Sequence, residues 1–433
     1  MQTSVSTGFT KARVLPGCED EGLSRFLFMA SDYKPNQGGI ATYVDNLVRG
    51  VIKVGIKAKM LALVHPDDRQ RTTFLENYEE WVEPFPVVYD QRPKSFVASK
   101  LVSSLEMVRC AWPLGRTYLD RMPCFRRSSE AMMRLSGILA REKPTTFIFG
   151  HLHIKFYPFV FPLLERQVPY GIIAHDFEIR KTRTRVNDVV RRGMLLKKAR
   201  WIAANSQHTK SLLEAWGLPS EKIMIIHPPL AEEAIRKSIQ LIVTHNERSF
   251  TLVTVCRLVR GKGVDIVLRA LQLLTQKNIP FRYIVAGDGP ERENLEQLAR
   301  ECGVRQKTHF AGYVTEEEKW SLLQSADVFV MPSRVKPNEQ HEGFGLAFVE
   351  AGAFGMPSVG TRCGGIPEAV LDGETGILVD PESPSRLAEA LTFLYNDLRK
   401  RKEMGEAGRK RAITQFSPTV VAARFLEEIS RRM

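Results

Sequence analysis

The sequence predicts an α/β protein with two doubly wound parallel sheets, one in each half of the chain. With 433 residues, the chain is longer than one hydrophobic core usually requires. Short apolar runs typical of buried strands alternate with amphipathic helical stretches. The alternation stops near residue 230 and starts again at residue 250. We therefore expect two Rossmann-like domains that face a central cleft.

The first half carries the strand and helix pattern of one such domain. Its first strand is expected at residues 25–31, followed by a Gly-Gly turn and an amphipathic helix at residues 40–54. Later strands are expected at residues 59–64, 146–149, 170–174 and 201–204. Residues 95–142 contain helical and irregular stretches, and no strand is expected there.

The second half repeats the architecture without a repeat of individual residues. Strands are expected at residues 250–255, 283–286 and 327–331, and helices at residues 264–274, 291–302 and 345–354. The predicted divisions are a flexible tail at 1–22, an N-terminal Rossmann-like domain at 23–235, a C-terminal Rossmann-like domain at 236–412 and a C-terminal helix at 413–433. We expect this last helix to pack back on the first domain.

The positive charge of the chain is concentrated in one segment. The net charge is +13, and residues 101–200 alone hold 19 Lys and Arg against 8 Asp and Glu. This segment is either an ordinary solvated face or a surface for an anionic partner such as a membrane. A helix at residues 185–199 adds an apolar stripe, which includes Met194, and its packing on the sheet or in lipid stays open.

Composition also limits where the protein works. The N-terminal residues lack the apolar stretch of a signal peptide, and no uncharged apolar run is long enough to span a bilayer. The six cysteines are scattered and contain no Cys-x-x-Cys pair, which argues against a zinc site or a disulfide framework. We expect a cytoplasmic protein, with peripheral attachment to the inner face of the membrane as an alternative.

Two glutamates eight residues apart form the strongest chemical signal. Glu342 precedes a predicted helix, and Glu350 lies about one turn inside it. The amides at the start of this helix form a favourable anion site, and glycines there allow a phosphate to approach the backbone. The residues of this helix start are Gly343, Phe344, Gly345 and Leu346. The arrangement predicts a site for a phosphate and for the hydroxyls of a ribose.

Two cations follow the first strand of the second half. Arg257 and Lys262 lie on the loop after that strand, and Gly263 opens the next helix. Surface cations are common, but on a loop between a strand and a helix that opens with glycine, these two are candidates for binding an anion.

Residues 342–350, together with the Gly-Gly-Ile-Pro-Glu stretch at 364–368, resemble the retaining glycosyltransferases of family 4, which have the GT-B fold. The resemblance covers most of the chain, and it makes residues 23–235 the acceptor domain and residues 236–412 the nucleotide-sugar domain. It implies that Arg257 and Lys262 bind the donor diphosphate, that Glu342 lies at the transferred sugar and that Glu350 holds the ribose. It places the base near the backbone of Gly312, Tyr313 and Val314.

The resemblance extends to the first half. Gly38 and Gly39 resemble the glycine-rich loop that approaches the donor from the opposite domain, and His175 resembles a histidine near the donor sugar. Two departures from the family pattern are His227-Pro-Pro229 in place of Asn-Gly and a long loop at residues 334–341. The Gly-His-Leu-His sequence at residues 150–153 lacks a third metal ligand at suitable spacing, which argues against a metal site there. No Asp-x-Asp occurs, which argues against the metal-dependent, single-domain class of glycosyltransferase.

These observations predict a retaining, metal-independent glycosyltransferase with no cofactor. Its substrates would be a nucleoside diphosphate sugar and a sugar or lipid-linked acceptor. The alternatives are a GT-B-fold sugar-nucleotide epimerase and a non-catalytic protein that binds nucleic acid or a sugar nucleotide. Because the sequence contains no recognisable nucleic-acid-binding module, we expect no nucleic-acid partner.

Overall fold

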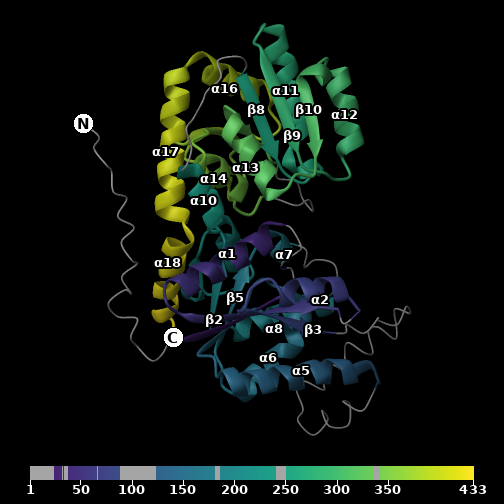
Figure 1. The fold of residues 1–433 in the computed structure, drawn as a ribbon, viewed down its shortest axis with the longest axis vertical. Helices are drawn as coiled ribbons and strands as arrows, with labels where there is room; N and C mark the ends of the chain where they lie inside the picture. The colour runs from purple at the N-terminus through teal and green to yellow at the C-terminus, as the bar shows by residue number, and fades with distance from the viewer. Residues whose placement is uncertain are drawn as a thin grey trace, which may run out of the picture.

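The computed structural model of the chain describes residues 24–31, 33, 38–65, 67–87, 123–180, 186–239, 250–334 and 342–433. It consists of two α/β domains, one above the other in Figure 1. The predicted tail at residues 1–22 and most of the long loop before Glu342 lie outside the described residues. The same is true of residues 101–122 of the basic segment.

The first domain contains a seven-stranded parallel sheet in the order β3-β2-β1-β4-β5-β6-β7. Its strands are β1 (Arg25–Ala30), β2 (Lys57–Val64), β3 (Val82–Pro86), β4 (Thr146–Phe149), β5 (Tyr170–Ala174), β6 (Trp201–Ala204) and β7 (Ile223–Ile225). The five predicted strands are confirmed, whereas β3 and β7 were not predicted. β3 contains Pro84 and Pro86, which an edge strand tolerates because it needs fewer ladder hydrogen bonds.

Helices cover both faces of this sheet. One face packs against α5 (Pro123–Glu142), α6 (Val160–Glu165), α8 (Val186–Lys198) and α9 (Gln207–Glu214). The other face packs against α1 (Gly39–Lys53) and a helix from the end of the chain. The basic helix α8 buries Leu195 and Leu196, whereas Met194, which we assigned to its apolar stripe, is 43% exposed.

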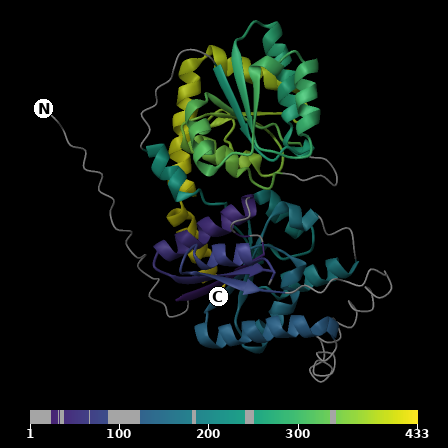
Figure 2. The same cartoon turned by 45° about the vertical axis from the view of Figure 1, so that its right-hand side comes forward.

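The second domain contains a six-stranded parallel sheet in the order β10-β9-β8-β11-β12-β13. Its strands are β8 (Phe250–Val255), β9 (Phe281–Ala286), β10 (Thr308–Gly312), β11 (Val328–Val330), β12 (Ser358–Thr361) and β13 (Gly376–Val379). Figure 2 shows both sheets after a 45° turn. Two parallel sheets in one chain confirm the predicted fold class.

Helices also cover both faces of the second sheet. One face packs against α11 (Val264–Gln276) and α16 (Pro384–Asn396). The other packs against α10 (Glu232–Ile239), α13 (Glu316–Ser325) and α14 (Leu346–Ala353). The predicted boundary at residues 235/236 falls inside α10, where Ala234 is already buried in the core of the second domain. The chain therefore crosses between the domains before the predicted boundary.

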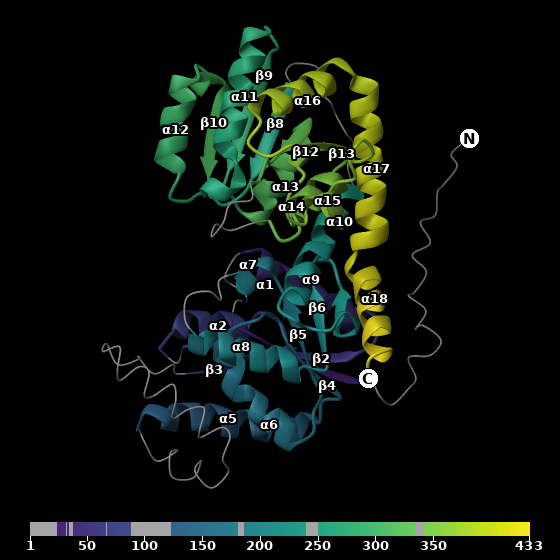
Figure 3. The same ribbon diagram turned by 180° about the vertical axis from the view of Figure 1, so that it is seen from behind.

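The chain crosses back to the first domain near its end (Figure 3). Helix α17 (Leu398–Phe416) lies on the second domain, and α18 (Pro418–Ser430) lies against α1 and the first sheet. The predicted boundary at 412/413 falls inside α17, because the helix continues to Phe416 and breaks at Ser417, which has an extended conformation. A Cβ atom added at Gly50 would lie 2.2 Å from the carbonyl oxygen of Pro418, which shows how closely α18 approaches α1.

Within the described ranges, no helix has the length and apolar character needed to cross a membrane.

Candidate active site

The loop that carries Glu342 and Gly343 lies where the two domains meet. Gly343 follows the long loop after β11, and it faces residues that follow β5 and β6 in the first domain. A Cβ atom added at Gly343 would lie 3.0 Å from Nδ2 of Asn205 and 3.3 Å from Cβ of Asp176. Any larger residue at position 343 would therefore press against the first domain. The carboxyl ends of parallel strands are the usual place for ligands in α/β proteins.

Lys262 and Glu342 form an ion pair at this junction. Nζ of Lys262 lies 2.5 Å from Oε2 of Glu342, and both side chains are largely buried. Burial favours loss of the ammonium proton, but the carboxylate of Glu342 outweighs this effect and raises the pKa of Lys262. Lys262 is therefore a fixed positive charge at neutral pH.

Close backbone contacts require glycine at three positions around the Lys262–Glu342 pair. Gly263 has a left-handed φ of 72°, and an added Cβ would lie 2.1 Å from the carbonyl oxygen of Pro332. The same test at Gly364 and Gly365 places a Cβ 2.2 Å from the carbonyl oxygens of Glu342 and Gly343, respectively. Only glycine fits such approaches. The Gly-Gly-Ile-Pro-Glu stretch therefore supports the backbone that carries Glu342.

Glu350 lies one turn inside α14 and is buried. Its Oε1 accepts a hydrogen bond of 2.9 Å from Nζ of Lys319, on α13. Burial raises the pKa of Glu350, and the positive charge of Lys319 counteracts this increase. Lys319 also pairs with Glu316 at 3.0 Å. The sequence analysis did not assign a partner to Glu350, because α13 follows a different strand.

The amino end of α14 contains the predicted phosphate-binding residues. Gly345 precedes the helix with a left-handed φ of 101°, and Phe344 is buried beside it. Leu346, the first helical residue, is half-buried. The first amides of any helix lack partners within the helix, so they are available to an anion at this end.

Arg257 and Lys262 occupy different environments, although they share one loop. Arg257 is exposed, and within the described part of the chain it has no ion pair. The loop is held by Arg334, which is 3% exposed and pairs with Asp265 at 2.9 Å and Glu382 at 2.7 Å. Arg334 also donates to the carbonyl oxygen of Arg260. No local sequence pattern points to Arg334, because it lies far along the chain from its partner Asp265.

The three residues predicted near the base are adjacent to the end of β10. Gly312 has a left-handed φ of 72°, and its carbonyl oxygen accepts a hydrogen bond of 2.7 Å from the amide of Gly287. Tyr313 is 59% exposed and Val314 is half-buried. The ends of β9 and β10 are therefore joined next to an accessible aromatic side chain.

His175 is buried at the end of β5 in the first domain. Its Nε2 lies 3.3 Å from the carbonyl oxygen of Gly150, and its ring meets Tyr43 edge-on at 5.3 Å. Burial lowers the pKa of His175 to about 4, although the bond to Gly150 opposes this shift. His175 is therefore neutral at pH 7.

The glycine pair before α1 lies apart from these contacts. Gly38 precedes α1, and both Gly38 and Gly39 are exposed. A Cβ atom added at either residue would meet no atom within 4 Å. Their predicted approach to the donor stays a prediction.

The described residues contain no group of three or more His, Cys, Asp or Glu side chains that is suited to hold a metal ion. His151 instead contacts Ser31, with 2.9 Å between Nε2 and Oγ. Metal independence of the reaction is a separate question, which an activity assay addresses.

Comparison with known proteins covers both domains. Residues 37–234 match the family model for glycosyltransferase family 4, and residues 236–411 match that for glycosyl transferases group 1. A GDP-mannose-dependent alpha-(1-6)-phosphatidylinositol monomannoside mannosyltransferase from Mycobacterium tuberculosis is 35% identical over 200 residues. That alignment covers 46% of this chain and 51% of the mannosyltransferase.

A D-inositol 3-phosphate glycosyltransferase from Corynebacterium urealyticum is 39% identical over 157 residues, which are 35% of this chain and 36% of that protein. The chain therefore spans about half the length, or less, of these two curated relatives.

Solved structures show the same fold at low sequence identity. The structure of Anabaena Alr3699/HepE in complex with UDP is 19% identical, covers 94% of this chain and all of its own, and has a TM-score of 0.68. Sucrose-phosphate synthase from Thermosynechococcus elongatus is 17% identical, with 94% and 98% coverage and a TM-score of 0.68. With family models matched in both domains, the chain belongs to the glycosyltransferases of the family 4 type and has the GT-B fold.

Proposed function

We propose that the protein transfers a glycosyl group from a nucleoside diphosphate sugar to an acceptor, with retention of configuration and without a metal ion. The observation that carries this proposal is the Lys262–Glu342 pair beside the amino end of α14, at the junction of the two domains. A fixed cation and helix amides together can hold a diphosphate. The adjacent carboxylate can then contact the sugar attached to it.

The proposed chemistry depends on charge that develops as the bond to the sugar breaks. The departing diphosphate gains negative charge, which Lys262, Arg257 and the amides at residues 343–346 would stabilise more strongly in the transition state than before it. Glu350 would bind the ribose hydroxyls through Oε2, because its Oε1 already accepts a hydrogen bond from Lys319. The positive charge of Lys319 favours the ionised carboxylate that accepts such hydrogen bonds. The base would lie beside Gly312 and Tyr313.

Retention follows if the acceptor attacks from the face that the diphosphate leaves. The departing diphosphate then takes the proton of the acceptor hydroxyl, the new glycosidic bond forms, and no enzyme carboxylate forms a covalent intermediate. Retaining glycosidases differ, because one carboxylate acts as nucleophile in that class. Glu342 would orient the sugar and stabilise its developing positive charge.

Two findings support a nucleotide-sugar donor and a lipid-linked acceptor. The mannosyltransferase relative is named for GDP-mannose and a phosphatidylinositol mannoside, and the Anabaena protein was solved with UDP. The basic segment of the first domain provides the charge that attracts an anionic membrane surface. We propose an acceptor on such a surface, next to the first domain.

A ligand screen tests the proposed activity. Purified protein is mixed with UDP-glucose, GDP-mannose or ADP-glucose, and its melting temperature and the release of nucleoside diphosphate are measured. A true donor raises the melting temperature, because it binds the folded state only. We expect turnover to persist in excess EDTA. No stabilisation by any of the three would contradict the proposal, as would activity that requires added Mg²⁺ or Mn²⁺.

A further inference from the structure

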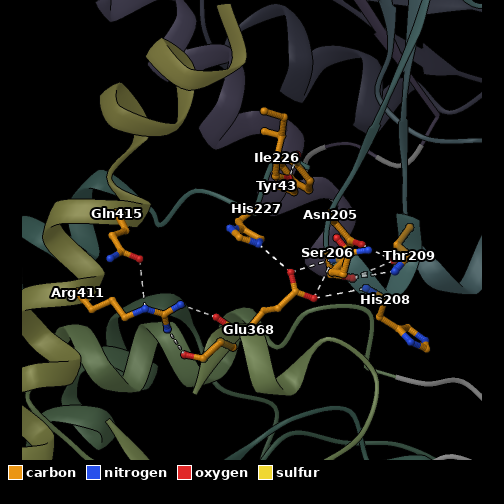
Figure 4. A network of polar contacts seen from close by, with 12 residues as sticks. Tyr43, Asn205, Ser206, His208, Thr209, Ile226, His227, Glu368, Arg411 and Gln415 are labelled. Carbon is orange, nitrogen blue, oxygen red and sulfur yellow. Dashed lines mark hydrogen bonds and ion pairs between the residues drawn. The ribbon is translucent and has the colours of Figure 1, made fainter. Parts of the chain in front are cut away.

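Glu368 of the second domain forms hydrogen bonds with the first domain (Figure 4). It lies on α15 (Ile366–Ala369), at the end of the Gly-Gly-Ile-Pro-Glu stretch. Both of its carboxylate oxygens lie 2.8 Å from the backbone nitrogen of Gln207, the first residue of α9. The backbone N–H of His208 also donates to Oε1, at 3.4 Å. A carboxylate is favourable at this end of a helix, and its bonds to amides are charge-assisted.

The same carboxylate contacts the segment that joins the domains. Nε2 of His227 lies 3.0 Å from Oε2 of Glu368, and both side chains are more than three-quarters buried. His227 is the first residue of the His-Pro-Pro sequence that departs from the family pattern. Its imidazole provides the polar nitrogen that meets Glu368, which gives this departure a structural role.

His227 in turn contacts the loop that carries Glu342. Its ring stacks on Phe344, with 5.0 Å between ring centroids and 25° between planes. Phe344 follows Gly343, the residue that meets Asp176 and Asn205 of the first domain. Glu368 is therefore connected to the candidate site through two side chains.

The backbone of Glu368 is held by a third element. Arg411 of α17 donates to the carbonyl oxygens of Glu368 at 2.5 Å and Ala369 at 2.7 Å. Helix α17 leads into α18, which packs on the first domain. A rigid backbone fixes the direction in which the Glu368 carboxylate points.

We propose that Glu368 is a positioning residue, which holds the two domains in the orientation that places the Glu342 loop against the ends of β5 and β6. It does so by binding the first amides of α9 and the ring of His227 together. This inference rests on the proposed function only for its effect on turnover. Each domain has its own hydrophobic cores, so loss of Glu368 loosens the orientation of the domains and leaves each of them folded.

Kinetics separate a positioning role from a general loss of stability. For Glu368→Ala, we expect kcat with the donor that the ligand screen identifies to fall about tenfold, while the Kd for free UDP or GDP stays within about threefold. The reason is that the side chains proposed to bind the nucleotide, those of Arg257, Lys262, Tyr313 and Glu350, all lie in the second domain. Glu389→Ala, which removes an exposed ion pair with Arg386 on α16, is the matched control and is expected to behave as wild type.

A second variant tests the role of His227, the side-chain partner of Glu368. His227→Phe keeps a ring that can stack on Phe344 and removes the nitrogen that meets Glu368. We expect a smaller fall in kcat, and little further loss when His227→Phe is combined with Glu368→Ala, because both changes break one connection. Fully additive losses would show that the two residues act separately, and this would overturn the proposal.

Hydrogen exchange tests the contact itself without any substrate. In Glu368→Ala, the amides of Gln207 and His208 are expected to exchange faster, while that of Leu213 in the last turn of α9 is unchanged. Unchanged exchange at Gln207 would overturn the proposal whatever the activity. Parallel losses in kcat, nucleotide affinity and melting temperature would also overturn it. If the wild type turns over no donor, the proposed function fails, while the exchange experiment still decides whether Glu368 joins the domains.

Discussion

The ammonium group of Lys262 lies 2.5 Å from the carboxylate of Glu342, although the two residues are 80 positions apart in the sequence. The family resemblance assigns them to different parts of the donor, the diphosphate and the sugar. Their pairing brings both parts to one place. A diphosphate that binds Lys262 would therefore either displace Glu342 from this cation or bind it together with Glu342.

Replacement of Lys262 tests this arrangement. We expect Lys262→Ala to lower kcat/KM about tenfold or more, because the variant lacks the cation nearest the leaving group. The measurement is donor turnover, with circular dichroism to confirm that the fold is retained. The exposed Lys277, changed to Ala, is the control. Wild-type turnover by Lys262→Ala would show that the diphosphate binds elsewhere.

Replacement of Glu350 and replacement of Glu342 are expected to affect different quantities, nucleotide affinity and kcat, respectively. Glu350→Gln should weaken the binding of free UDP or GDP about tenfold, since its partner is the ribose. Glu342→Gln should mainly lower kcat and should not weaken that binding, since its partner in the donor is the transferred sugar and the amide no longer competes with a diphosphate for Lys262. Titration calorimetry and initial rates measure the two quantities. Equal effects of both variants on nucleotide affinity would contradict these roles.

Lys319 is expected to control the charge of Glu350. In Lys319→Met, burial acts on Glu350 without its cation, so the pKa of Glu350 rises further and the carboxyl group takes up a proton nearer neutral pH. Nucleotide affinity should therefore fall and should recover as the pH is raised. Affinity that stays flat with pH in Lys319→Met would exclude an ionised Glu350 from ribose binding.

Burial of His175 is expected to lower the free energy of unfolding at acid pH. Burial lowers its pKa from 6.5 to about 4, so the folded state prefers the neutral ring. The stabilisation is complete above pH 6.5 and is lost as the pH falls towards 4, because the unfolded state binds the proton first. The loss amounts to about 3 kcal/mol, since one pKa unit corresponds to about 1.4 kcal/mol. Denaturant titrations should show a flatter pH dependence for His175→Gln, and identical slopes would contradict this prediction.

The basic surface of the first domain predicts binding to anionic vesicles. Lys197, Lys198 and Arg134 are exposed, and so are the apolar side chains of Met133 and Met194. We expect sedimentation with phosphatidylglycerol vesicles at low salt, none with zwitterionic vesicles, and weaker binding as salt rises. Replacing the three cations by Ser should reduce the binding and leave donor hydrolysis unchanged.

The control for this experiment removes the same charge elsewhere. Lys277, Lys402 and Lys410 are exposed lysines of the second domain, and their replacement by Ser should leave vesicle binding intact. Arg192 is unsuitable for the test, because it donates to the carbonyl oxygen of Glu178 and so holds α8 in place. A wild-type protein that ignores anionic vesicles at low salt would favour a soluble acceptor.

Local patterns in the sequence were sufficient to predict most of the fold. Buried parallel strands appear as short apolar runs, and eight of the thirteen strands in the described residues were predicted in this way. Two of the missed strands, β3 and β7, lie at the edges of the first sheet, and β3 contains two prolines. The position of Glu350 inside α14 also followed from the sequence, because a glycine-rich start and a glycine stop define that helix.

The sequence by itself therefore determined the fold class, the strands that form the two sheets and the helix that carries Glu350. Only the tertiary structure decided which side chains meet: Lys262 with Glu342, Lys319 with Glu350, and Glu368 with His227. The physical reason is that periodic burial is a property of short segments. An ion pair between distant residues depends instead on strand order and on how two domains pack, which no short segment encodes.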